Sequence, residues 1–135
     1  MAEIAMGIIL ILHGLVHGLY LAHARQLMDI TKDLAWPADS WVLAALVEER
    51  WLRITAAVLL GAAGFGFGAS GLVLLAGGSW WRTPLVTAGG ISTLVYLLFW
   101  DGQFHRLADQ GFLALVINLA LLVLSPLLLP GGPGP

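Results

Sequence analysis

Four long apolar stretches dominate this chain of 135 residues, and none of them contains a lysine, an arginine, an aspartate or a glutamate. They cover Ile4–Ala24, Ile54–Ala76, Pro84–Trp100 and Gly111–Leu129. The hydrocarbon core of a bilayer, ~30 Å thick, needs about 20 residues of helix, and only helices or closed barrels satisfy every backbone amide there. Barrel strands would be about ten residues long and would alternate apolar with polar side chains, which these stretches do not. The sequence therefore predicts an all-α fold, a bundle of four transmembrane helices forming a single integral membrane domain over residues 1–135.

The composition supports a membrane protein and excludes several classes of function. Hydrophobic residues make up 59% of the chain against 10% charged, and the mean hydropathy is +0.91, well outside the range of ordinary soluble domains. Cysteine is absent, which excludes disulfides, thiolate metal ligands and a cysteine nucleophile. The net charge is −2 and the basic residues are scattered, so we expect no nucleic-acid partner.

The tryptophans indicate where the membrane boundaries lie. All six avoid the middle of the apolar stretches, as expected of rings that favour the headgroup level. They are Trp51 before the second stretch, Trp80 and Trp81 before the third, Trp100 at its end, and Trp36 and Trp41 in the first loop.

The lysines and arginines predict the orientation. The loop 25–53 carries Arg25, Lys32, Arg50 and Arg53, the third loop carries Arg106, and the second loop carries only Arg82. Because basic loops stay in the cytoplasm, we expect both termini on the outer side of a bacterial plasma membrane. The first loop is also rich in acidic residues, which favours a solvated segment over a basic clamp for lipids.

The first loop is long for a small bundle. Ser40 could cap a short helix running through Glu49, after a break at Trp36-Pro37. We expect this segment to form either an interfacial helix or a lid over the bundle, with an extension of the second transmembrane helix as the alternative.

Small residues predict how the helices pack. Ala57, Gly61, Gly64, Gly68 and Gly71 recur every three or four residues and so share one helical face. A second set, Gly7, Gly14 and Gly18, lies in the first stretch. Lipid provides no hydrophobic drive for helix association, so close approach through small residues stabilises the contact. The first two helices should therefore pack tightly together, or one of them should meet its copy in a homodimer.

Two histidines, His13 and His17, lie in the middle of the first stretch. Their spacing of four residues places both imidazoles on one helical face, together with Tyr20. Polar side chains at membrane depth are costly, usually point into the bundle, and often mark a functional site. These residues are therefore the main candidates for any chemistry.

The sequence leaves several roles open for the pair. With a carboxylate from another helix they could ligate a metal, although no third ligand at their depth is evident. They cannot be both axial ligands of one haem, because groups on one helical face do not reach opposite faces of the ring. They could instead make structural hydrogen bonds to Asn118, Ser92 or Thr93. In the remaining interpretation they form the polar end of a pocket for a lipophilic molecule, with Asn118 and Tyr20 assisting and Gly64 shaping the wall.

Several short motifs resemble a group of uncharacterised bacterial four-helix membrane proteins that is loosely similar to the DoxX-like families. They are His13-Gly14-Leu15-Val16-His17, Trp80-Trp81, Leu98-Phe99-Trp100-Asp101-Gly102 and Val116-Ile117-Asn118-Leu119, and the likeness covers nearly the whole chain. DoxX-like proteins are mostly small membrane subunits associated with quinone-linked oxidation. The resemblance therefore implies a four-helix membrane fold and favours a redox-accessory or lipophile-binding role. It assigns no catalytic residue and no cofactor.

From the histidine pair, the glycines and the resemblance, we expect a small binding or accessory protein rather than a stand-alone enzyme. It would hold a quinone- or lipid-like molecule in the bilayer, as a monomer, a homodimer or part of a larger membrane complex. One alternative is a membrane enzyme or transporter with a histidine-carboxylate metal site. Another is a purely structural subunit of a membrane complex.

Overall fold

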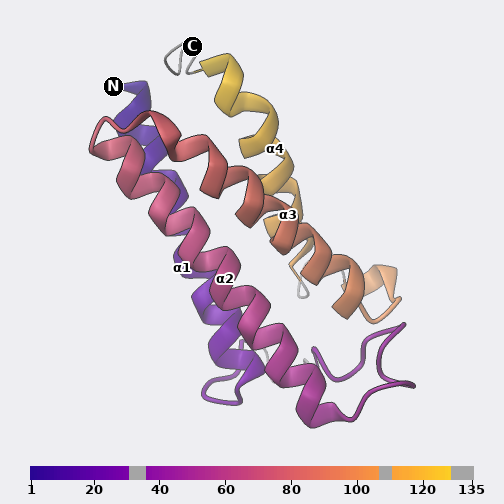
Figure 1. The fold of residues 1–135 in the computed structure, drawn as a ribbon. Coiled ribbons are helices and arrows are strands. Elements are labelled where there is room, and N and C mark those ends of the chain that lie inside the picture. Colours follow the sequence, from indigo (N-terminus) through magenta and orange to yellow (C-terminus); the bar gives the residue numbers. More distant parts are fainter. Residues whose placement is uncertain (31–35, 107–110, 129–135) are drawn as a thin grey trace.

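The computed structural model describes residues 1–30, 36–106 and 111–128, and within these ranges the chain is helical and contains no strand. The α-helices are α1 (Ala2–Ala24), α2 (Glu49–Leu75), α3 (Arg82–Phe99) and α4 (Phe112–Leu128), and two single 3-10 turns are η1 (Ser79–Trp81) and η2 (Phe104–Arg106). Successive helices run in opposite directions, so the start of α1 and the end of α4 lie at the same end of the molecule (Figure 1). The predicted all-α four-helix bundle is confirmed.

The helices follow the apolar stretches closely. The largest difference is α2, which begins at Glu49 instead of Ile54 and shortens the first loop. An ion pair of 2.7 Å between Arg53 Nε and Glu49 Oε1 spans one turn and stabilises this added segment. Glu49 also suits a first helical turn, where a negative charge complements the backbone dipoles. The predicted end of the fourth stretch at Leu129 lies outside the described residues.

Within the described residues, three helical segments are long and apolar enough to cross a membrane: Ala2–Ala24, Glu49–Leu75 and Ser79–Phe99. In the described part of the chain α4 is shorter, with 17 residues. Such a helix is about 25 Å long, which is near the lower limit for a span. Large apolar side chains such as Leu15, Phe65 and Leu72 are exposed on the outer faces. Apolar surfaces of this kind are stable against lipid tails but not against water. The exposed outer faces are therefore those expected of a membrane protein.

Glycines bring α1 and α2 into the most extensive helix contact of the bundle. A methyl group added at Gly14 would lie 2.7 Å from the carbonyl oxygen of Gly64, and one at Gly71 would lie 2.6 Å from that of Gly7. Side chains cannot occupy such distances, so only glycine permits this separation of the two backbones. The predicted tight contact between the first two helices is confirmed.

The described part of the first loop, residues 36–48, forms turns, so the predicted short helix from Ser40 through Glu49 is wrong. Ser40 Oγ accepts a hydrogen bond of 3.0 Å from the Leu43 amide, as a cap would, but it donates to the carbonyl of Leu98 at 2.6 Å. The ring N–H of Trp41 donates to the carbonyl of Leu97 at 2.9 Å. The last carbonyls of a helix have no partner within it. The loop supplies these partners and therefore folds against the C-terminal end of α3 rather than forming a helix of its own.

Two tryptophans, Trp36 and Trp81, are buried in the bundle, whereas the sequence predicts all six at the membrane boundaries. Trp51 and Trp80 are exposed near helix ends, whereas Trp36 and Trp81 are only 2% and 4% exposed. The ring of Trp36 packs edge-on against Tyr20 and Phe99, at centroid distances of 5.7 and 6.2 Å. Folding of the loop onto α3 carries Trp36 into the bundle, so it contributes to the core and not to the headgroup layer.

Candidate functional site

A layer of polar side chains lies between two apolar clusters in the interior. One cluster, around Leu10, Phe67 and Leu85, lies toward the start of α1, and the other, around Trp36, Leu60 and Phe99, lies toward its end. Between them are four buried polar residues from three helices: His13 and His17 on α1, Ser92 on α3 and Asn118 on α4. Polar groups in such surroundings are stable only when they are hydrogen-bonded.

These four residues form one continuous hydrogen-bond network. His13 Nε2 lies 2.6 Å from Asn118 Oδ1, and Asn118 Nδ2 lies 2.7 Å from Ser92 Oγ. Ser92 Oγ in turn lies 2.6 Å from His17 Nε2, and His17 Nδ1 lies 3.0 Å from the backbone carbonyl of His13. The network begins and ends at His13, and it joins α1, α3 and α4 at the middle of the bundle.

Donor and acceptor roles follow around the network from two groups that can only accept, the carbonyl of His13 and Oδ1 of Asn118. A charged imidazole is costly at membrane depth, so each ring carries one proton. The carbonyl of His13 can only accept, so His17 carries its proton on Nδ1 and its Nε2 is an acceptor. Ser92 must then donate to His17 Nε2 and accept from the amide N–H of Asn118. Asn118 Oδ1 accepts the Nε2 proton of His13. Both imidazoles are neutral in this arrangement, in opposite tautomers, and no charge is placed at membrane depth.

Phe67 on α2 completes the surroundings of the histidines. Its fully buried ring meets His13 edge-on at a centroid distance of 4.6 Å and His17 at 5.2 Å. The two imidazoles also meet each other edge-on at 4.9 Å. Sequence reasoning did not select Phe67, although it lies one helical turn from both Gly64 and Gly71 on the small-residue face of α2. This spacing is the sequence signal that indicates a position for Phe67 at the contact between α1 and α2.

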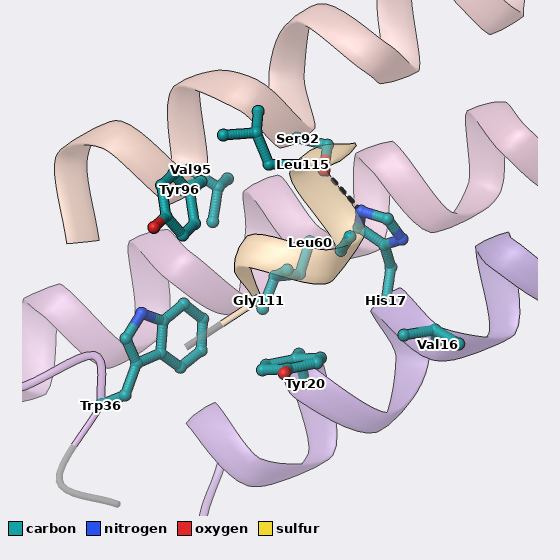
Figure 2. A pocket seen from close by; sticks show the side chains of 11 residues that line it. Val16, His17, Tyr20, Trp36, Leu60, Ser92, Val95, Tyr96, Gly111 and Leu115 are labelled. Atoms are coloured by element: carbon teal, nitrogen blue, oxygen red, sulfur yellow. Dashed lines mark hydrogen bonds between the residues drawn. The ribbon is translucent and has the colours of Figure 1, made fainter. Parts of the chain in front are cut away.

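A small cavity adjoins the His17–Ser92 edge of the network. It measures about 30 Å³, the space of roughly one water molecule, and the wider depression that includes its open side measures about 370 Å³. Figure 2 shows His17 and Ser92 at one end of this space and Trp36 at the other. The remaining lining is mostly apolar or aromatic: Val16, Tyr20, Leu60, Val95, Tyr96, Gly111, Ala114 and Leu115.

The residues predicted for a ligand site occupy three different positions. His17 and Tyr20 line the cavity. His13 and Asn118 belong to the hydrogen-bond network but do not line the cavity. Gly64, on α2, does not line the cavity but faces α1, where a methyl group added to it would be 3.3 Å from the Cβ of His17. It lines a separate apolar groove of about 310 Å³ with other glycines of α1 and α2.

Among the described residues, no group of three or more histidine, aspartate or glutamate side chains is placed to hold a metal ion. His23 is buried at the end of α1, with Nδ1 3.2 Å from the carbonyl oxygen of Met28. His105 is exposed on η2, and Asp109 lies outside the described residues. The described part of the chain therefore shows no ligand set that would extend the His13–His17 pair.

Comparison of the chain with protein-family models, with curated proteins and with solved structures finds no match. The resemblance to DoxX-like proteins therefore stays a prediction from short motifs. The candidate site is defined by its geometry alone.

Proposed function

We propose that this chain is a small integral membrane protein that binds the polar end of a lipophilic molecule in the cavity beside His17 and Ser92. One observation carries the proposal: a buried hydrogen-bonding pair lines a mostly apolar and aromatic cavity in a bundle with apolar outer faces. Sites for small lipophilic molecules combine apolar walls with a few polar groups that orient the ligand. A quinone-like or lipid-like molecule with a compact polar end fits this description.

The polarity of the network favours a ligand that donates a hydrogen bond. Ser92 donates its only proton to His17 Nε2 and accepts one bond from Asn118, which leaves one lone pair on its oxygen. His17 Nε2 is itself an acceptor. A hydroxyl group of the ligand could therefore donate to Ser92, or replace Ser92 as the donor to His17, without charging either ring. An alcohol or phenol, including a reduced quinone, satisfies the Ser92–His17 end of the cavity, whereas a carbonyl or ether oxygen finds no free proton on either of these two residues. The ring N–H of Trp36, buried without a hydrogen-bond partner among the described residues, lies at the other end of the cavity.

The size of the cavity also favours a hydroxyl. A volume of about 30 Å³ accepts a group the size of one water molecule. The apolar remainder of the ligand would then extend over the aromatic and aliphatic lining toward Tyr20 and Tyr96. A water molecule is the competing occupant, and the experiment must distinguish the two.

We place the protein in a bacterial plasma membrane with both termini outside the cytoplasm. Membrane insertion is supported by three helices of sufficient length and apolarity in the part of the chain that the structure describes. The excess of arginine and lysine in the first and third loops supports the orientation.

The first experiment is native mass spectrometry with elemental analysis on gently extracted protein. A retained lipophilic molecule of defined mass would support the proposal, and stoichiometric metal would favour a metal-dependent enzyme or transporter instead. The second experiment titrates the purified protein with 4-hexylphenol and with its methyl ether, 4-hexylanisole, and measures binding by calorimetry. We expect the phenol to bind about tenfold more tightly, as one neutral hydrogen bond of about 1 kcal/mol or slightly more implies.

The double variant Ser92→Ala/His17→Leu should remove this preference, because it removes both acceptors at this end of the cavity, and Thr93→Val is the matched control. The Thr93 hydroxyl donates to the carbonyl of Gly89 in its own helix, at 2.8 Å, and does not line the cavity. Equal binding of phenol and ether would contradict the hydroxyl-specific site. No binding of either would contradict the proposed function.

A purely structural subunit is the second candidate, because the network is closed on itself. Every bond in it joins residues of the bundle, and so it stabilises the packing of three helices without any ligand. In that case Ser92→Ala would lower stability, and the extracted protein would carry neither lipophile nor metal.

A further inference from the structure

A second concave site lies at the end of the bundle where α1 ends and α2 begins. It is a groove of about 510 Å³, and no part of the network or of its cavity belongs to it. The groove is lined by Ala24, Arg25 and Gln26 from the end of α1 and by Glu49, Arg50, Arg53 and Ile54 from the start of α2. We call these residues the arginine groove.

The arginine groove concentrates half of the basic residues of the chain, since three of its six lysines and arginines line it. Glu49 is the only acidic residue in the lining, and it is paired with Arg53 at 2.7 Å. Arg25 and Arg50 are exposed, and neither forms an ion pair with a carboxylate of the described residues. The groove therefore carries a net positive charge and offers two guanidinium groups for an external anion.

The position of the groove is at the membrane boundary. Arg25 directly follows the last residue of α1, and Ile54 begins the apolar stretch of α2. Trp51, which is 54% exposed, lies beside the groove at the level expected for an interfacial ring. The guanidinium of Arg50 lies 5.8 Å from the centroid of that ring, which holds its charge near the same level.

We infer that the arginine groove binds the phosphate of an anionic phospholipid headgroup. A guanidinium group can donate two parallel hydrogen bonds to the oxygens of one phosphate. This geometry makes arginine more specific for phosphate than a point charge such as the lysine ammonium group. The groove also includes the start of α2, whose preceding residue Glu48 makes no side-chain capping bond. The Trp51 N–H donates to the carbonyl of Glu48, so the N–H groups of Glu49 and Arg50 are the ones left as donors at this helix end. A lipid, rather than a free anion, fits because Ile54 and the apolar face beyond it lie next to the groove, where acyl chains would extend.

The abundance of acids in the first loop predicts a solvated segment and no basic clamp, but among the described acids of loop 25–53 only Glu49 lies with the arginines, paired with Arg53. Asp29, Asp39 and Glu48 do not line the groove, whereas Arg25 from the end of α1 is brought next to Arg50 and Arg53. The charge of the groove is thus a property of the helix pair rather than of the loop composition.

The test is native mass spectrometry of the full chain in detergent, titrated with equimolar phosphatidylglycerol and phosphatidylcholine. We expect preferential retention of phosphatidylglycerol, and about fivefold weaker retention for each of Arg25→Gln and Arg50→Gln. Arg82→Gln is the matched control, because Arg82 lies at the start of α3, at the opposite end of the bundle (Figure 1). Helical circular dichroism of each variant checks that the bundle is intact.

Equal retention of the two lipids by the native chain would overturn the inference. So would a loss of phosphatidylglycerol with Arg82→Gln that matches the loss with Arg25→Gln. Inorganic phosphate is the third arm: displacement of the bound lipid by phosphate at millimolar concentration would show a site for the free anion and would overturn the lipid assignment. Failure of the hydroxyl ligand to bind near His17 would leave these results unaffected, because the two sites share no residue.

Discussion

His17 Nε2 lies 2.6 Å from the Oγ atom of Ser92, although the two residues are 75 positions apart in the chain. This hydrogen bond connects α1 to α3 at the middle of the bundle. The proton on His17 Nδ1 is held by the carbonyl of His13, so Ser92 must be the donor. The arrangement explains how two imidazoles are accommodated in an apolar interior without charge. It also makes the side of the network that faces the cavity an acceptor of hydrogen bonds.

Asn118→Leu should destabilise the bundle. The substitution leaves the Nε2 proton of His13 and the oxygen of Ser92 without their partner in an apolar interior. Interhelical hydrogen bonds in membranes contribute about 0.6–1.7 kcal/mol each, so we expect a loss of about 1–3 kcal/mol for the two together. Reversible unfolding in mixed micelles measures it. Thr93→Val should change stability by less than about 0.5 kcal/mol, as for a site outside such a network, and an equal effect of both variants would contradict the network.

Gly14→Ala should weaken the contact between α1 and α2, whereas Gly18→Ala should not. A methyl group at Gly14 would lie 2.7 Å from the carbonyl oxygen of Gly64, but at Gly18 it meets no atom within 4 Å. Overpacking of this kind costs about 1–3 kcal/mol. Gly18→Ala should be neutral or slightly stabilising, since alanine favours helix by up to about 1 kcal/mol. Thermal unfolding of the pair in detergent gives the comparison, and the opposite order would refute the glycine contact.

Phe67→Ala and Phe65→Ala should differ strongly although the residues are two positions apart. Phe67 is fully buried against both histidines, whereas Phe65 is 79% exposed on the outer face. Removing a buried phenylalanine leaves a cavity and costs about 3–5 kcal/mol in protein cores. Lipid replaces the contacts of an exposed ring, so Phe65→Ala should change the free energy of unfolding little. Similar losses for the two variants would show that α2 is rotated differently.

The orientation can be tested by single cysteines, because the chain has none of its own. Leu27→Cys lies just beyond α1, and Ser79→Cys lies in η1 at the opposite end, and both positions are exposed. With the first loop in the cytoplasm, an impermeant thiol reagent added to intact cells should label Ser79→Cys and leave Leu27→Cys unlabelled. Labelling after lysis confirms that both thiols are reactive. The reverse pattern would invert the topology.

Much of the helical architecture could be predicted from local sequence. The apolar stretch Ile4–Ala24 corresponds to α1 within two residues, and Pro84–Trp100 corresponds to α3 with similar accuracy. Helix backbone bonds are made within each segment, so the length and apolarity of a stretch are enough to locate it. The shared face of His13 and His17 follows from the same local periodicity.

Partners of the candidate site were only partly predictable. Asn118 and Ser92 were expected as hydrogen-bonding options for the histidines, and both are used, but Thr93 instead bonds within its own helix. Spacing along α3 does not distinguish adjacent hydroxyls, because the rotation of α3 about its axis depends on packing against α2 and α4. The rotation of α2 depends on packing in the same way, so the prediction that Gly64 shapes the wall of the histidine pocket is wrong, and Gly64 lines a different groove.

The sequence by itself determined the helices and their approximate ends, since these depend on interactions between residues a few positions apart. Only the tertiary structure decided that the loop residue Ser40 bonds to the end of α3, that Arg25 lies beside Arg50, and that His13 meets Asn118 across 105 positions. Those contacts depend on how close the helices approach and how each is rotated. Both are set by the fit of glycine surfaces and by the need to satisfy buried polar groups, which act across the whole bundle.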